Sequence, residues 1–225
     1  MSDTDSFIEE VTEEVKRDKL FATIKRYGWI AVLGVVVLVG GAAYNEVRKA
    51  QQQSAAQASG DAILAALQAG DGGNVTALAD VKTEAPQAQI VADLLLGAEQ
   101  LASGDSAAAG ATFDGVALSG GDMPAIYRDI AAFKSVLANA ETMPIADRRA
   151  ALEALSNPGA PLAFLAQEQL ALADIEEGNP TAAIERLNGI VEDASATAGL
   201  RRRATQLIVA LGGTPSDAVG VTVEQ

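Results

Sequence analysis

A stretch of 19 residues, from 27 to 45, contains no charged side chain and is bounded by charged residues on both sides. As an α-helix with a rise of about 1.5 Å per residue it is about 28 Å long, close to the roughly 30 Å thickness of a bilayer's hydrocarbon core. Aromatic side chains occupy its ends, where membrane helices carry interfacial anchors: Tyr27 and Trp29 at the start and Tyr44 at the end. The stretch therefore predicts a single transmembrane helix over residues 27–45.

Basic residues near the predicted span indicate its orientation, because Lys and Arg are enriched on the cytoplasmic side of membrane helices. Two of them, Arg48 and Lys49, follow the span, and five precede it: Lys16, Arg17, Lys19, Lys25 and Arg26. This excess predicts a cytoplasmic N-terminus and a C-terminal domain across the membrane, in the periplasm if the cell is bacterial. The expected topology is that of a single-pass type II protein of the bacterial inner membrane.

A cleaved signal peptide is the competing interpretation, since Gly41 and Ala43 resemble the small residues that precede a cleavage site. A signal peptide, however, opens with a short basic stretch and has an apolar core of about 7 to 15 residues. Here a head of 26 residues with mixed charge precedes a longer apolar run. A retained span fits this pattern better.

Composition favours an all-α domain after the span. Hydrophobic residues make up 49% of the 225 residues, but only 4% are aromatic, a balance that suits close-packed helices better than β-sheets. Residues 46–225 carry 11 basic and 23 acidic side chains, a net charge of −12. Such a domain is repelled by nucleic acid and by anionic lipid. The absence of cysteine excludes disulfides and a lipoprotein anchor.

Apolar periodicity, glycine and proline divide the chain into five parts. Residues 1–26 are expected to form an amphipathic cytoplasmic head, 27–45 the span, 46–59 a helical stalk, 60–211 a helical-repeat domain and 212–225 a flexible tail. The Gly-rich loop at 70–73 is expected to end the helix that follows the span. Beyond a short segment at 74–81, the pattern predicts helices over 86–103, 105–118, 122–137, 145–155, 162–177, 180–191 and 199–211, with Asp105, Asp122 and Asn179 as N-caps and Pro86, Pro124 and Pro180 in first turns.

A shift of 74 residues superposes two parts of this domain, with Gly104 falling on Gly178 and Asp105 on Asn179. The shift corresponds to two units of about 34 residues, the period of tetratricopeptide repeats, with a few inserted residues. The spacing of that repeat predicts the residues that pack the paired helices: Leu96, Gly97, Ala109 and Phe113 in one pair, and Leu170, Ala171, Ala183 and Leu187 in the other.

Residues 122–156 would supply a degenerate middle pair. The alternative is an alanine-rich helical bundle in which the matching positions arise by chance. The predicted fold is all-α, with a single N-terminal transmembrane helix followed by a tetratricopeptide-like helical-repeat domain.

The chain resembles a known family in its order of parts and in two segments. A charged head leads into RYGWIAVLGV, and the span ends in YNEVRKAQQQSAAQASGDAI before the degenerate helical repeats. These features are similar to the YfgM-type ancillary subunits of the SecYEG translocon. The resemblance implies a periplasmic repeat domain associated with the translocon and with periplasmic chaperones such as PpiD, and no catalytic residues. The repeat domain also resembles that of the cell-division coordinator CpoB, which leaves the pathway open.

Side chains suited to catalysis are scarce. The sequence has no histidine and no cysteine, which removes most nucleophile, general-base and transition-metal arrangements. Lys134 and Ser135 are adjacent and would point in different directions on a helix, which disfavours a Ser/Lys dyad. The carboxylates of Asp174, Glu176 and Glu177 are expected to form a solvated helix end. We expect no enzyme activity, no cofactor and no metal.

The run of three basic residues at 201–203 stands out in the acidic domain. Three consecutive helical residues spread over about 200° around the helix axis, so at most two of them share a face. We expect this run to be solvated or paired with Glu192 and Asp193 rather than to bind an acidic partner.

The function that these patterns predict is a membrane-tethered, non-catalytic scaffold whose periplasmic repeat domain binds protein partners. The family resemblance implies the SecYEG translocon and a periplasmic chaperone as those partners. The alternative is a structural accessory subunit of another inner-membrane assembly, held mainly through its transmembrane helix. Neither nucleic acid nor a small-molecule substrate is expected.

Overall fold

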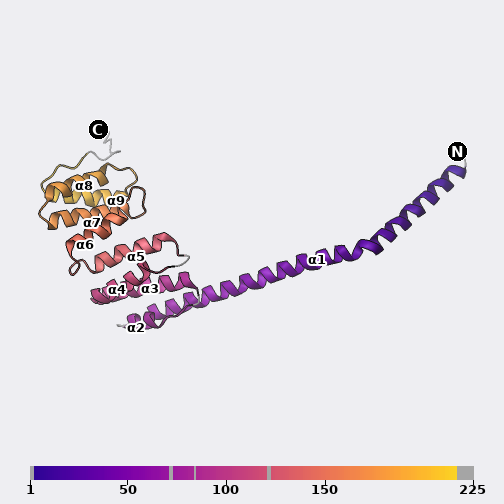
Figure 1. Ribbon diagram of the computed structural model, residues 1–225, viewed down its shortest axis with the longest axis horizontal. Helices are drawn as coiled ribbons and strands as arrows, with labels where there is room; N and C mark the ends of the chain where they lie inside the picture. The colour runs from indigo at the N-terminus through magenta and orange to yellow at the C-terminus, as the bar shows by residue number, and fades with distance from the viewer. Residues whose placement is uncertain (1–2, 71–72, 84, 121–122, 217–225) are drawn as a thin grey trace. The chain divides into compact units, whose positions relative to one another are not determined.

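The computed structural model describes residues 3–70, 73–83, 85–120 and 123–216, which contain α-helices and no β-strand (Figure 1). Side chains are described from Lys25 onward, except those of residues 26–28 and 31–32. The chain divides into two compact units, Met1–Gln57 and Ala58–Gln225. The all-α class predicted from composition is confirmed.

Helix α1, Asp3–Leu67, makes up the described part of the first unit and contributes its last turns to the second. The large apolar side chains described between Trp29 and Val47 are exposed, from 49% at Ile30 to 75% at Leu38. Across the side chains that are described, the structure has no helix that is both long enough and apolar enough to cross a membrane. The side chain of the predicted anchor Tyr27 lies outside the described residues.

The second unit is a succession of short helices joined by tight connections (Figure 1). Neighbours in sequence pack against each other from α2 to α9, as short loops between helices require. The helices are α2 (Gly73–Asp80), α3 (Pro86–Ala102), α4 (Ser106–Ala117), α5 (Ala125–Ala138), α6 (Ile145–Leu155), α7 (Ala163–Glu176), α8 (Pro180–Glu192) and α9 (Ala198–Ala210).

The core of this unit is divided into local clusters, each shared by helices that are close in sequence. Ile63, Leu78 and Ala92 join the end of α1 to α2 and α3. At the other end, a cluster that includes Leu187 and Ile208 joins α7, α8 and α9. This nearest-neighbour burial is the organisation of a helical-repeat protein.

The pairs α3–α4 and α7–α8 repeat the same turn at the 74-residue shift. Gly104 and Gly178 occupy the left-handed region, with φ of 87° and 77°, where glycine has no Cβ penalty. The amide of Asp105 donates to Gln100 O at 2.9 Å, and the equivalent amide of Asn179 donates to Asp174 O at 2.8 Å. These bonds satisfy carbonyls at the helix ends, so the two turns fold back in the same way.

The helix pairs α3–α4 and α7–α8 fill the same interhelical space with different combinations of small and large residues. In α3–α4 a glycine, Gly97, faces the fully buried ring of Phe113. In α7–α8 the equivalent residues are Ala171 and Leu187, both fully buried. A larger residue on one helix therefore accompanies a smaller one on its partner, which keeps the interhelical space filled.

Helix starts follow the sequence only in part. Asp105 caps α4 as predicted, because its carboxylate accepts a bond from the amide of Ala108 at 3.0 Å. Asn179 is the N-cap residue of α8, but its side chain makes no capping bond. Pro124 lies at the N-cap of α5 rather than in the first turn, and Asp122 lies outside the described residues.

Replacing Gly97 by Ala is expected to destabilise the chain by about 1 kcal/mol or more, in spite of the higher helix propensity of alanine. The added Cβ would lie 2.6 Å from Cε1 of Phe113. Adding Phe113→Leu, which reproduces the volumes of the second pair, should relieve this clash, and the two changes should couple by about 1 kcal/mol in urea unfolding followed by circular dichroism.

The matched control for this cycle is Gly115→Ala in α4, where an added Cβ meets no atom within 4 Å. It should be neutral or stabilising, because alanine favours the helix. If the effects of Gly97→Ala and Phe113→Leu on the free energy of unfolding simply add, the proposed contact between these two positions is contradicted.

Candidate functional site

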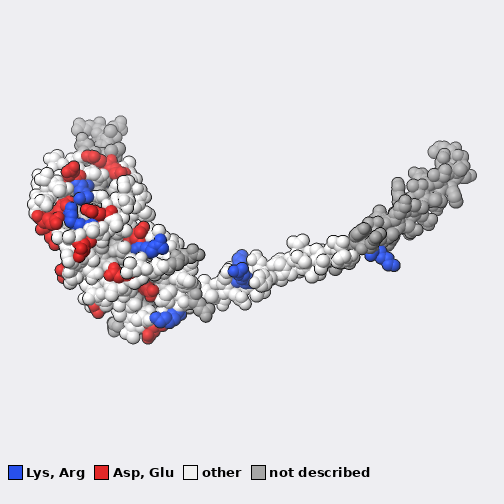
Figure 2. Space-filling model, viewed as in Figure 1, with Lys and Arg blue, Asp and Glu red and all other residues white. Residues whose placement is uncertain are grey.

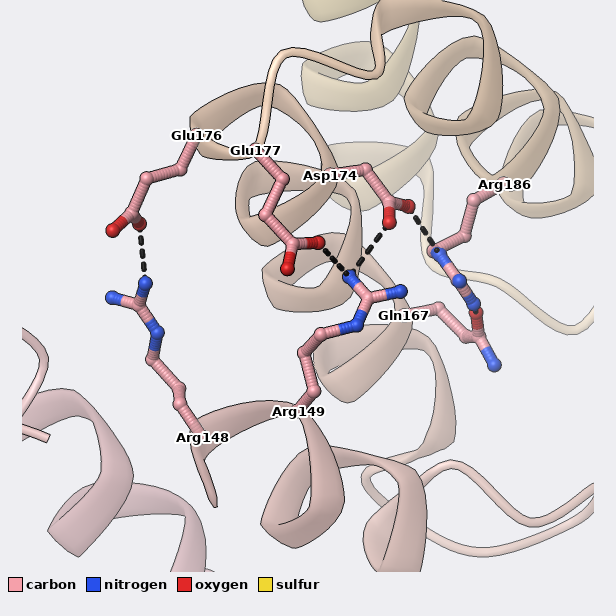
Figure 3. Close-up of polar contacts among 7 residues, drawn as sticks. All are labelled: Arg148, Arg149, Gln167, Asp174, Glu176, Glu177 and Arg186. Carbon is pink, nitrogen blue, oxygen red and sulfur yellow. Dashed lines mark hydrogen bonds and ion pairs between the residues drawn. The ribbon is translucent and has the colours of Figure 1, made fainter. Parts of the chain in front are cut away.

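A buried carboxylate, Asp174, joins three helices of the second unit (Figure 3). It lies in the last turn of α7 and is 2% exposed. Arg149 of α6 donates to its Oδ1 at 2.7 Å, and Arg186 of α8 donates to its Oδ2 at 3.0 Å. The prediction of a solvated carboxylate is wrong for Asp174, because arginines from both neighbouring helices reach it.

The pKa of Asp174 reflects two opposing effects. Burial raises it, but hydrogen bonds from Arg149 and Arg186, together with their positive charges, outweigh burial, so the pKa of Asp174 lies below its ordinary value. The hydrogen bond to Asp174 in turn raises the pKa of Arg149. Asp174 and Arg149 therefore stay charged at neutral pH, and together with Arg186 they form a structural clip between α6, α7 and α8.

Further ion pairs extend the clip to both sides. Glu176 pairs with Arg148, and Glu177 lies 3.2 Å from Arg149 (Figure 3). Among the described residues on the face shown in Figure 2, acidic and basic side chains lie next to each other in the part built by α6 to α9. The network links α6 to α7 at their surface, where a single pair contributes little.

The basic run at 201–203 is paired differently from the prediction. Arg203 donates to both oxygens of the buried Glu168 at 2.8 Å, and this bonding raises the pKa of Arg203. Arg201 donates to backbone carbonyls in the connection between α8 and α9, including that of Ala196. The predicted solvation fits Arg202, which is exposed, whereas pairing with Glu192 or Asp193 is wrong for Arg203, because its partner Glu168 lies on α7.

An open cleft, here called the α7–α8 recess, lies where α7 begins and α8 ends. Its volume is about 900 Å³. Phe164 and Ile190 belong to its apolar lining, and Arg186 in its wall donates to Gln167 at 2.7 Å. The recess is thus connected to the Asp174 clip through the guanidinium of Arg186.

The recess also carries acidic side chains. Glu185 and Asp193 line it and are exposed. Bonds from the hydroxyl and then the amide of Ser195 lower the pKa of Asp193. Its carboxylate is therefore ionised at neutral pH and gives the rim a negative charge.

A smaller cleft, the α3–α4 recess, lies where α3 begins and α4 ends and has a volume of about 380 Å³. Ile90 and Val116 contribute apolar lining, and Asp93 contributes a carboxylate. Gln89 donates to that carboxylate at 2.9 Å. None of the described residues that line this recess is basic.

Among the described residues that line the two recesses, groups suited to catalysis do not converge. Lys134 lies over the ring of Phe113, 5.4 Å from its centre, while Ser135 is buried and accepts a bond from Asn139. The described residues contain no group of three or more acidic side chains placed to hold a metal ion. The recesses offer apolar surface beside fixed charges, an arrangement that suits the binding of a partner or ligand.

The residues predicted to pack the repeats lie where the helix pairs meet. Leu96 is half-buried, and the other seven are buried: Gly97, Ala109, Phe113, Leu170, Ala171, Ala183 and Leu187. Of the predicted membrane anchors, Trp29 and Tyr44 are exposed. Among the topology-setting residues, Lys25 is exposed, and the side chains of Lys16, Arg17, Lys19 and Arg26 lie outside the described residues.

Sequence reasoning missed both recesses and the clip. The clip had a signal, because Arg149, Asp174 and Arg186 each lie on a predicted helix with mostly apolar neighbours. A weaker sequence signal for the recesses is the pair Gly115 and Gly189, which coincide under the 74-residue shift.

Comparisons with known proteins identify no relative. No protein-family model matches the chain, and searches of curated proteins and of solved structures gave no match either. A proposal for its function therefore rests on the residues and contacts described above.

Replacing Asp174 by Asn is expected to lower the free energy of unfolding by about 2 to 3 kcal/mol at neutral pH, because two arginines lose their anion. This loss of stability is small for the breaking of a buried ion pair, because the side chains of Arg149 and Arg186 are 24% and 26% exposed and can be hydrated once the carboxylate is removed. Glu176→Gln is the matched control, with a carboxylate that is 57% exposed, and should cost at most about 0.5 kcal/mol.

The effect of Asp174→Asn should also depend on pH. The folded pKa lies below the unfolded value of about 4, so the stabilisation is fully present above that value and is lost as the pH falls through the folded pKa. Urea unfolding should therefore show a difference between the two chains that shrinks below about pH 4. A difference that stays constant through this range would contradict the charged clip.

Proposed function

We propose that the chain is a membrane-tethered, non-catalytic scaffold whose helical-repeat domain binds protein partners. The observation that carries this proposal is the repeated helix pair, in which α3–α4 and α7–α8 share their turn, their packing positions and an open recess. Stacked helix pairs of this kind present extended binding surface. The described lining of the recesses holds apolar surface and fixed charges but no converging catalytic groups.

The pairs are proposed to be tetratricopeptide-like. Their shift of 74 residues fits two units of about 34 residues with a short insertion, and α5–α6 would be the pair between them. The small residues at Gly97 and Ala171 opposite large ones at Phe113 and Leu187 support the same proposal, because that repeat combines small and large residues at these spacings.

The membrane tether is proposed for residues 27–45. It is supported by the 19 uncharged residues of that run and by the large apolar side chains described from Trp29 to Tyr44, which are 49% to 75% exposed. Uncovered apolar surface of this kind is costly in water and favourable in lipid. The basic residues before the run support a cytoplasmic N-terminus and a C-terminal domain in the periplasm of a bacterial cell.

The export channel and its chaperones are the partners that we propose. Support for SecYEG and a periplasmic chaperone comes from the resemblance in the two segments that flank and form the run at 27–45. The second candidate is an accessory subunit of another inner-membrane assembly. Its support is the set of small residues in the run, such as Gly34, Gly40 and Gly41, which allow close contact between helices.

Purification of the full chain in mild detergent should recover translocon or chaperone components, identified by mass spectrometry. A chain that ends after Gln53 should lose them, because the proposed binding element is the repeat domain. Recovery that is undiminished without residues 54–225 would favour the accessory-subunit function. If only other membrane proteins are recovered, the export channel is ruled out as a partner, while the scaffold function stands.

A reporter fused after Gln225 tests the topology. Alkaline phosphatase folds only outside the reducing cytoplasm, because it needs disulfides, so it should be active at this position. A green fluorescent protein placed before Ser2 should fluoresce in the same cells. Phosphatase that is inactive at the C-terminus would reverse the proposed orientation.

A further inference from the structure

The two recesses are the same site in two repeats. Eight of the ten residues that line the α3–α4 recess fall, after a shift of 74, on residues that line the α7–α8 recess. The matching pairs include Ile90 with Phe164, Asp93 with Gln167, Gly115 with Gly189, Val116 with Ile190 and Ser119 with Asp193. Chance surface hollows would not coincide at so many positions, so the repeat itself builds the recess.

A glycine holds each recess open at the same place. Gly115 in α4 and Gly189 in α8 lie in helices, and a Cβ added at either would meet no atom within 4 Å. Both glycines line their recess. Glycine in the middle of a helix lowers its stability relative to alanine, so the folding of the helices gives no reason for glycine here, whereas space for an incoming side chain does.

The charge of both recesses is negative. Arg186 is the one basic residue among the described lining of the α7–α8 recess, and Asp174 and Gln167 already hold its guanidinium. In the described part of the chain Glu185 and Asp193 take part in no ion pair. Among the described residues that line the α3–α4 recess, Asp93 is the one that carries a charge.

We propose that each recess is a docking site for a protein segment that presents an apolar side chain next to a Lys or Arg. The apolar side chain enters beside Ile90 and Val116, or beside Phe164 and Ile190, and the cation faces the acidic rim. This inference rests on the proposed function, in which the repeat domain binds protein partners, and it adds the chemistry of the segment that is bound.

The size and number of the recesses define the binding further. About 900 Å³ in the α7–α8 recess leaves room for an aromatic side chain with its flanking backbone, and about 380 Å³ in the α3–α4 recess suits a smaller one. One anchor of this kind binds weakly. A partner with two anchors occupies both recesses of one domain, and the second contact then forms at high effective concentration.

The test uses the full chain in detergent and two labelled peptides, SGFKGS and SGFEGS, which differ only in the sign of the charge beside the phenylalanine. Binding is measured by fluorescence anisotropy. The lysine peptide should bind about 2- to 5-fold more tightly than the glutamate peptide, as expected for one exposed ion pair. Equal binding, tighter binding of the glutamate peptide, or no binding of either at about 1 mM chain would overturn the proposal.

Filling the recesses tests the site. The double variant Gly115→Leu and Gly189→Leu should weaken the lysine peptide at least about 10-fold, since the leucine side chains would occupy the space of the anchor. Gly199→Leu is the matched control: it lies in α9, its added Cβ also meets no atom within 4 Å, and it lines neither recess. Unchanged binding in the double variant would overturn the proposal.

A charge change provides a second route that does not depend on the packing of leucine. Glu185→Lys, at an exposed position of the α7–α8 recess, should reduce the preference for the lysine peptide over the glutamate peptide. Glu192→Lys makes the same charge change at an exposed position of α8 outside both recesses and should leave the preference unchanged. Equal effects of the two variants would overturn the proposal.

Co-purification separates this inference from the proposed function. If the double leucine variant retains all protein partners of the unchanged chain, the recesses are not the docking sites, while the scaffold function stands. If the unchanged chain recovers no protein partner at all, the scaffold function falls. If the unchanged chain recovers protein partners and the double leucine variant loses them, the result supports both the scaffold function and the docking recesses.

Discussion

The second unit depends on one requirement, that two short helices fold back on each other closely enough to bury their shared face. The left-handed glycines Gly104 and Gly178 provide the reversal, and the small residues Gly97 and Ala171 provide the close approach. A single pair of this length cannot bury enough apolar surface to be stable alone. Stacking of successive pairs therefore follows from the same requirement, and so does the division of the core into clusters shared by neighbouring helices.

The helix pairs α3–α4 and α7–α8 form chemically different hydrogen bonds at one pair of equivalent positions. In α3–α4 the hydroxyl of Thr112 donates to Gln100 at 2.7 Å, and at the equivalent positions of α7–α8 Arg186 donates to Asp174 at 3.0 Å. A neutral bond needs no further partner, whereas a buried carboxylate needs additional donors. Arg149 supplies one of them from α6, so the charged version ties the α7–α8 pair to the pair before it.

Local sequence signals predicted the helices and their turns well, because glycine, proline and apolar spacing act within a few residues. The 74-residue shift correctly paired Gly104 with Gly178 and Phe113 with Leu187, which occupy equivalent turns and equivalent core positions. The partners of Asp174 in the clip, and the pairing of Arg203 with Glu168, were not predicted, because the paired residues are 12 to 35 positions apart in sequence. Such contacts depend on how the helices pack. From sequence alone, a carboxylate at a helix end is expected to be solvated, because the positions of arginines on neighbouring helices are not known.

The recesses follow from the geometry of the repeat rather than from any one residue. A pair that is closed by its turn at one end diverges at the other, where α3 or α7 begins and α4 or α8 ends. Core residues such as Val116 and Ile190, which are 3% and 1% exposed, line the open end, and a glycine beside each of them leaves space there. Because the clip already neutralises Arg186 inside the wall, the charge left at the α7–α8 rim is acidic. The interactions that stabilise the pair thus also determine the sign of the charge that a partner meets there.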